Sequence, residues 1–213
     1  MPKKTSAANT STNHSTDNST AAIIAAWDAF SDGDYRAPAL NVTGTLSITS
    51  DAPAELRDLA AVAAFALGRQ SQDDWATILS FRALYAPNQL DTGCFAGLAE
   101  GYAALNDHEY DRAADLLGQW LLNREYHAPV VFERFLEAAR SSERFRLLGD
   151  VSKKFIGLPA YQGLAAQGFF LSNFHQDRFK EAVLVFEKFR ELFDASVIQQ
   201  KAALAMMRLG RSQ

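Results

Sequence analysis

The apolar positions between Cys94 and Asn123 fall on two helical stripes separated by a short polar turn. The first half has the i, i+3, i+4, i+7 spacing of one face of an α-helix, with Phe95, Leu98, Ala99 and Tyr102. The second half repeats this spacing with Tyr110, Ala113, Ala114, Leu117 and Leu121. Asn106 and Asp107, which lie between the stripes, are residue types that favour turns and helix caps. The pattern therefore predicts two helices folded back on each other.

The same hairpin pattern recurs along the chain. The second helix of each predicted hairpin opens with an aromatic residue that is followed at +3 and +4 mainly by small or aliphatic residues, at Tyr35, Trp75, Tyr110, Phe145 and Phe179. These aromatic residues are 40, 35, 35 and 34 residues apart. One such hairpin cannot bury its own apolar faces, so this period indicates hairpins that stack on one another.

The pattern predicts an all-α chain of eleven helices. They form five hairpins and one final helix that covers the open end of the stack. In chain order, we expect helices at 22–30 and 35–48, 55–67 and 75–85, two within 94–123, and then 129–140 and 143–155, 161–172 and 178–193, and 196–209. Residues 1–20 are rich in Ser, Thr and Asn and are expected to form a disordered tail. Residues 21–213 are expected to form one repeat domain with a continuous core.

Composition and charge narrow the classes of function. The chain has 25 acidic and 21 basic residues and a formal net charge of −4, so it lacks the basic footprint that nucleic-acid binding requires. No apolar run approaches the roughly 18 residues of a membrane span, and no apolar stretch follows the two N-terminal lysines as a secretory signal would require. The single cysteine, Cys94, excludes an intramolecular disulfide. We therefore expect a cytoplasmic protein with neither nucleic-acid nor membrane partners.

The sequence offers little that could carry out catalysis. It contains no metalloprotease, nucleophile-elbow, phosphate-binding or dinucleotide-binding motif. His108 and His175 fall at nearly equivalent positions in two predicted turns, but neither has a histidine or carboxylate at i+4 on a helix. We expect no enzymatic activity, no metal and no cofactor. An enzyme or a small-molecule sensor would need convergent polar groups in a closed pocket, and the sequence identifies none.

Three groups of residues carry a resemblance to a known family: Leu98-Ala99-x-x-Tyr102 with Tyr110-x-x-Ala113, Gly33-Asp34-Tyr35 with Trp27, and Phe179-x-x-Ala182-x-x-x-Phe186. In these pieces and in its period, the chain resembles tetratricopeptide repeat (TPR) proteins from about residue 21 to its end. The resemblance implies a right-handed solenoid of about five antiparallel helical hairpins plus a C-terminal capping helix. It also implies a concave groove, lined by the first helix of each hairpin, that holds a peptide or helix of another protein.

The groove residues would be those of each first helix that face away from the hairpin core. In the register of the third repeat, six positions are expected to bind the partner: Asp28, Phe65, Glu100, Glu137, Arg140 and Phe169. Phe65 and Phe169 would form apolar pockets, and Glu100 and Glu137 would select a segment with basic neighbours. The alternative is that both phenylalanines pack against the next hairpin and that the glutamates are merely solvated.

The leading interpretation is therefore an interaction module, an adaptor or chaperone that holds another protein. A second interpretation is a structural subunit that self-assembles into a homo-oligomer without a groove ligand. In that case an open end or a convex face would form the contact, and Met206 and Met207 would be buried between chains.

Overall fold

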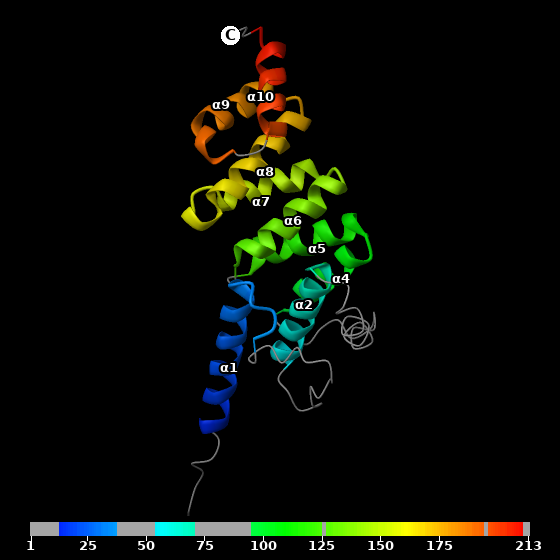
Figure 1. Ribbon diagram of the computed structural model, residues 1–213, viewed down its shortest axis with the longest axis vertical. Helices are drawn as coiled ribbons and strands as arrows, with labels where there is room; N and C mark the ends of the chain where they lie inside the picture. Colours follow the sequence, from blue (N-terminus) through cyan, green and yellow to red (C-terminus); the bar gives the residue numbers. More distant parts are fainter. Residues whose placement is uncertain (1–12, 38–53, 71–94, 125–126, 194–195, 211–213) are drawn as a thin grey trace, which may run out of the picture. The chain divides into compact units, whose positions relative to one another are not determined.

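The computed structural model of the chain describes residues 13–37, 54–70, 95–124, 127–193 and 196–210 (Figure 1). Within these residues, all regular secondary structure is helical and no strand occurs, which confirms the all-α prediction for this part of the chain. The chain divides into two compact units, Met1–Phe95 and Ala96–Gln213. Each unit is described by itself below, and the single repeat domain expected over 21–213 stays a prediction.

The first unit contains helix α1 (Asn13–Ser31) and helix α2 (Ala54–Gln70). Helix α2 confirms the helix expected at 55–67. Helix α1 begins within the segment expected to be a disordered tail, because no glycine or proline interrupts the chain between Asn13 and Ser31. Tyr35 and Arg36 form a turn rather than the start of a helix. The remainder of the helix expected at 35–48, and the whole of the helix expected at 75–85, lie outside the described residues.

Aromatic side chains form the core of the first unit beside α1. The Trp27 ring stacks on Phe95 at a centroid distance of 5.3 Å, and Phe30 lies 5.6 Å from Trp27 and 5.7 Å from Tyr35. On α2, the run from Leu59 to Leu67 is buried throughout. Alanine fills five of these nine positions, and such small side chains allow other parts of the chain to approach the helix closely.

The second unit is a succession of helices, each packed against the next along the chain (Figure 1). In order they are α4 (Ala96–Asn106), α5 (Tyr110–Asn123), α6 (Pro129–Ser141), α7 (Phe145–Phe155), the short 3₁₀ helix η3 (Pro159–Tyr161), α8 (Gln162–His175), α9 (Phe179–Lys188), the 3₁₀ helix η4 (Arg190–Leu192) and α10 (Ser196–Arg208). These helices confirm the two expected within 94–123 and those expected at 129–140, 143–155, 161–172 and 196–209. The helix expected at 178–193 is shorter, because α9 ends at Lys188.

The apolar stripes predicted from the sequence form the core of this unit. Leu98, Ala99 and Tyr102 on α4 are fully buried, as are Ala113, Ala114, Leu117 and Leu121 on α5. On α9, Val183 and Phe186 are buried as predicted, but Phe189 is only half-buried. The chain bends at Phe189 into η4, and this bend returns Phe193 to the core, where its ring stacks on Phe186 at 5.7 Å. The helix expected at 196–209 ends at Arg208, and Leu209 follows it in a turn at the surface.

The same turn ends the first helix of each pair in the second unit. The chain takes a left-handed conformation at one residue of the turn, with φ of 60° at His108, 58° at Glu143 and 58° at Asp177. In the first turn, the N–H of Glu109 donates to the carbonyl of Ala104 at 2.9 Å and that of His108 to Leu105 at 3.1 Å. These two bonds define a Schellman motif, which satisfies carbonyl groups that the helix end leaves free.

The other turns repeat both hydrogen bonds. Arg144 and Glu143 donate to Ala139 and Arg140, and Arg178 and Asp177 donate to Asn173 and Phe174. In the first unit, Asp34 and Gly33 donate to Ala29 and Phe30, with φ of 79° at Gly33. Gly210, with φ of 68°, follows α10 at the corresponding place. In the second unit the left-handed residues 108, 143, 177 and 210 are therefore 35, 34 and 33 residues apart, which makes α4, α6, α8 and α10 equivalent helices.

Candidate functional site

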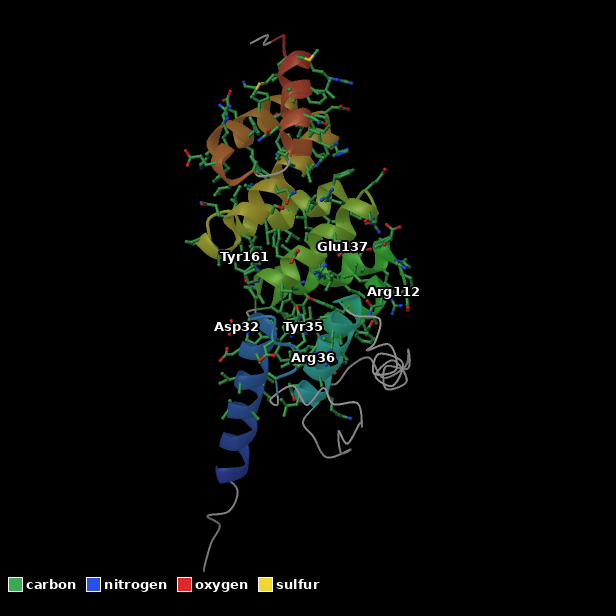
Figure 2. The ribbon with its side chains drawn as sticks, in the orientation of Figure 1. Asp32, Tyr35, Arg36, Arg112, Glu137 and Tyr161 are labelled. Atoms are coloured by element: carbon green, nitrogen blue, oxygen red, sulfur yellow. The ribbon has the colours of Figure 1, made fainter. Side chains whose placement is uncertain are left out.

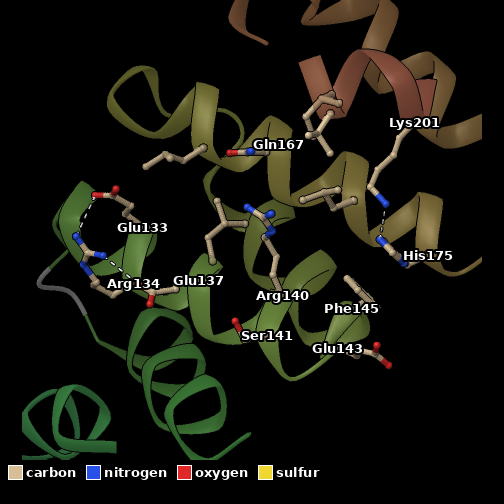
Figure 3. A pocket seen from close by; sticks show the side chains of 15 residues that line it. Glu133, Arg134, Glu137, Arg140, Ser141, Glu143, Phe145, Gln167, His175 and Lys201 are labelled. Carbon is tan, nitrogen blue, oxygen red and sulfur yellow. Dashed lines mark hydrogen bonds and ion pairs between the residues drawn. The ribbon is translucent and has the colours of Figure 1, made fainter. Parts of the chain in front are cut away.

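A groove of about 710 Å³ lies in the second unit and is lined by α6, α8, α10 and the turn that precedes α7 (Figure 3). Helices α6, α8 and α10 each end in the left-handed turn described above, so the groove is lined by three helices that share this turn. Side chains from these helices meet here because α6 contacts α8, and α8 contacts α10. The groove combines an apolar floor with charged side chains at its edges.

Five aliphatic side chains form the apolar part of the groove. Leu136, Leu171 and Ile198 are buried and belong also to the core, whereas Leu164 is half-buried and Val197 is 52% exposed. Leu164, Gln167, Leu171 and His175 line the groove from α8 at intervals of three and four residues. This spacing places them on one face of the helix. Leu164 and Val197 are therefore the aliphatic side chains that a ligand in the groove can cover.

The acidic side chains on α6 are held by an arginine of the same helix. Arg134 donates to the Glu137 carboxylate at 2.9 Å and lies 4.0 Å from Glu133 (Figure 3). Burial alone would lower the pKa of Arg134, but the hydrogen bond to Glu137 and the charge of Glu133 together raise it. Arg134 therefore stays protonated, and its charge offsets part of the negative charge at this end of the groove.

The other end of the groove has a cationic pair beside a histidine. The Lys201 ammonium lies 3.2 Å from His175 Nε2 and 4.7 Å from the centroid of the Phe174 ring. The Phe145 ring stacks parallel on His175 at 3.9 Å. An ammonium group only donates hydrogen bonds, so Nε2 is the acceptor and His175 carries its proton on Nδ1. Figure 3 shows the Arg140 side chain extending from α6 toward α8.

The charge state of His175 follows from these neighbours. Burial lowers the pKa of the imidazole, and the positive charges of Lys201 and Arg140 lower it further against the opposing charge of Glu143. The ring is therefore neutral at pH 7, in agreement with its place as acceptor of the lysine proton. Both cations influence the same ring, so Arg140 and Lys201 act on a common region of the groove.

The structure brings two of the six predicted site residues together. Glu137 and Arg140 both line the groove. Glu100 does not, and its side chain, 13% exposed, lies 3.4 Å from Arg112 of α5, which is labelled in Figure 2. Phe169 is half-buried on α8, and Asp28 is exposed on α1 in the first unit. A role of these residues in partner binding stays a prediction.

Phe65 and the expected register on α8 require correction. Phe65 is 1% exposed, so the prediction that it stands open on an inner column is wrong. On α8, Phe169 does not line the groove, and Ala165 and Ser172, which lie four residues before it and three residues after it on the same helix face, are buried. Ser172 packs against Gly149 of α7, which turns the neighbouring positions of α8 toward the groove.

Among the groove residues that sequence reasoning missed are Leu164, His175, Val197 and Lys201. The 3- and 4-residue spacing of Leu164, Gln167, Leu171 and His175 was a usable signal, but α8 is apolar on two faces, so periodicity alone did not tell the groove from the core. His175 closes α8, two residues before the left-handed Asp177, whereas His108 is itself the left-handed residue, so the two histidines are not equivalent.

The described residues hold no group of three or more histidine, cysteine, aspartate or glutamate side chains that could bind a metal ion. Among the helices that the structure describes, none combines the length and apolar character needed to cross a bilayer. Comparison of the chain with protein-family models, curated proteins and solved structures found no match.

Proposed function

We propose that this protein is an interaction module, an adaptor or chaperone, that binds a peptide or helix of another protein in the groove between α6, α8 and α10. The observation that carries the proposal is that the half-buried Leu164 and the exposed Val197 lie in the groove beside buried aliphatic side chains, with charged side chains around them. Apolar anchors within a polar rim are the usual composition of a protein-binding surface.

The repeated turn supports a TPR-like architecture as part of the same proposal. Stacked hairpins would form a right-handed solenoid in which α4, α6, α8 and α10 are the first helices of successive repeats. The resemblance to TPR proteins implies that first helices line the concave, ligand-binding side. The groove lies on three of these four helices. We place the protein in the cytoplasm, where its single cysteine stays reduced.

Selection of peptides from a random display library on the whole chain tests the groove. We expect enriched peptides to bind the wild-type chain and to bind Leu164→Ser/Val197→Ser about tenfold more weakly, because that variant removes the apolar anchors that a ligand covers. Neither position is fully buried, so the variant should keep its fold, which circular dichroism checks.

The matched control is Leu184→Ser/Leu204→Ser, which changes two exposed aliphatic side chains of α9 and α10 that do not line the groove. The control should bind the peptides as the wild-type chain does. Equal binding to the wild-type chain and to the Leu164→Ser/Val197→Ser variant would reject the groove as the binding site.

A specific observation also favours the second candidate, self-assembly. On α9 and α10, outside the groove, Leu184, Leu204 and Met207 are exposed, with Met207 at 71%, and Met206 is half-buried. If these side chains meet in a homo-oligomer, light scattering should give a multiple of the 23.4 kDa chain mass for the wild type and a monomer for Leu204→Ser/Met207→Ser. A monomeric wild-type chain at high concentration would reject this candidate.

A further inference from the structure

Two cations of the groove have bonding capacity that the described residues do not use. The Arg140 guanidinium is exposed and makes no hydrogen bond or ion pair within the described part of the chain. The Lys201 ammonium donates one of its three N–H groups to His175 and lies over the Phe174 ring. Both side chains line the same groove, and both are close enough to His175 to affect its titration.

The acidic side chains on α6 are less available than these cations. Glu137 already accepts a hydrogen bond from Arg134, and Glu133 is the second carboxylate beside that guanidinium. Glu100, which was expected to select a basic segment, lies near Arg112 and does not line the groove. Glu143 is the one further carboxylate that lines it, and it is exposed at the edge, in the turn before α7. Of the charged groups that line the groove, Arg140 and Lys201 are therefore the ones whose N–H donors no carboxylate of the described residues uses.

We propose that the groove selects an acidic partner segment, in which an aspartate or glutamate side chain binds Arg140 and Lys201 while a neighbouring apolar residue covers Leu164 and Val197. This inference rests on the proposed function and names the partner chemistry of the same site. It reverses the basic partner expected from Glu100 and Glu137. A guanidinium fork and an ammonium each form charge-assisted hydrogen bonds with carboxylates.

The stacked rings of Phe145 on α7 and His175 on α8 hold Lys201 in place before a ligand binds. The neutral imidazole of His175 accepts a hydrogen bond from the ammonium at 3.2 Å, and Phe145 stacks on the face of the imidazole at 3.9 Å. A lysine side chain that is already ordered loses less conformational freedom when it binds a ligand. Lys201 therefore acts as a pre-positioned cation, and Arg140 extends toward the same region from α6.

The test extends the peptide selection to charge variants of the whole chain. On the wild-type chain, enriched peptides should combine aliphatic residues with aspartate or glutamate. The Arg140→Glu/Lys201→Glu variant should enrich lysine and arginine instead. The control Arg146→Glu/Lys153→Glu makes the same change of formal charge on exposed residues of α7 outside the groove, and it should enrich the wild-type peptides.

Affinity measurements then locate the contact. Selected peptides are synthesised with acetylated and amidated ends, so that side chains supply every carboxylate. Changing their Asp or Glu to Asn or Gln should weaken binding to the wild-type chain roughly three- to tenfold, as expected for two solvent-exposed charge contacts. The same change should have little effect on binding to Arg140→Gln/Lys201→Gln, because the residues that recognise the carboxylate are then absent.

The outcomes separate this inference from the proposed function. If no peptide binds the wild-type chain more tightly than the Leu164→Ser/Val197→Ser variant, the proposed function fails. If the selected peptides depend on Leu164 and Val197 but are neutral or basic, the groove binds protein segments and only the acidic partner is rejected. Enrichment of basic peptides on the α7 control would show that overall charge, rather than Arg140 and Lys201, decides the selection.

Discussion

At the scale of single residues, the pKa of His175 depends on the burial of its ring and on the charges of Lys201 and Arg140 at the cationic end of the groove. Because burial and two nearby cations lower its pKa from the ordinary value of 6.5, the imidazole should titrate below 6.5 in the folded chain. Lys201→Gln removes one of the cations and should raise the pKa of His175 toward its ordinary value. Proton NMR of the four histidine rings as a function of pH measures this shift.

The sign of the pH dependence follows from the same contacts. An imidazole whose pKa is lowered by folding binds its proton more weakly in the folded state than in the unfolded state, so protonation destabilises the fold. The contribution of His175 to stability should therefore be present above pH 6.5 and be lost as the pH falls from 6.5 through the lower folded pKa. The His175→Gln variant should lack this part of the pH dependence. An unchanged pH profile of stability would show that folding does not lower the pKa of His175.

Lys154 offers a second test at the residue scale, in which a lysine of one helix stabilises the end of another. Its ammonium donates to the carbonyls of Leu121 and Leu122, at 2.8 and 2.9 Å, in the last turn of α5. These carbonyls lack helical partners and carry the negative end of the helix dipole. Lys154→Met should lower the free energy of unfolding by about 1–2 kcal/mol in urea denaturation. Lys153→Met, at the exposed neighbouring position, should change it by less than about 0.5 kcal/mol.

At the scale of helices, the α7–α8 contact depends on glycine. A Cβ on Gly168 would collide with Ser152 Oγ and lie 3.0 Å from Leu148, and a Cβ on Gly149 would collide with Ser172 Oγ. Each glycine of one helix thus faces a buried serine of the other, so the two helix backbones approach closely. This contact also sets the rotation of α8 that presents Leu164 and His175 to the groove.

Gly168→Ala should therefore be destabilising although alanine favours helices. Overpacking at such a contact costs about 1–3 kcal/mol, which exceeds the gain in helix propensity of about 1 kcal/mol. Gly163→Ala on the same helix is the matched control, because no atom lies within 4 Å of its added Cβ, and it should be neutral or stabilising. Thermal unfolding measures both changes. Equal stability of the two variants would contradict a close contact between α7 and α8.

The turns show where sequence patterns predict structure and where they do not. The apolar stripes that begin at the aromatic residues Tyr110, Phe145 and Phe179 correctly predicted helices α5, α7 and α9. They were recognisable because each of these helices buries only one face. The left-handed residues were not predicted, since glycine marks the turns at Gly33 and Gly210 but His108, Glu143 and Asp177 occupy this position in the other turns. A non-glycine residue in this conformation is held by its hydrogen bonds and neighbours, which a single-sequence pattern does not reveal.

At the scale of the whole molecule, the predicted binding positions overlap with the observed groove only in part. Glu137 and Arg140 line the groove, the other four of the six positions implied by the resemblance to TPR proteins do not, and partner binding stays a prediction. The charge preference was expected to be acidic on the protein side. The i, i+3 spacing of Arg134 and Glu137 on a predicted helix was a usable sign of their ion pair, but sequence alone does not show that Arg112 lies near Glu100. Glu100 and Arg112 are 12 residues apart in the sequence and lie on different helices, so their ion pair depends on how the helices pack. Whether a charged side chain is free to bind a partner therefore depends on the fold.

The division into two compact units leads to the last prediction. Every residue that lines the groove lies between Glu133 and Lys201, within the unit Ala96–Gln213, and that unit buries its own apolar stripes from α4 to α10. A chain of residues 96–213 should therefore unfold cooperatively by circular dichroism and bind the selected peptides within about threefold of the full chain, a difference of less than about 1 kcal/mol. A fragment that lacks a cooperative transition would show that the first unit is needed for the fold of the second. A folded fragment that binds more than tenfold more weakly, a loss above about 1.4 kcal/mol, would place part of the binding surface within residues 1–95.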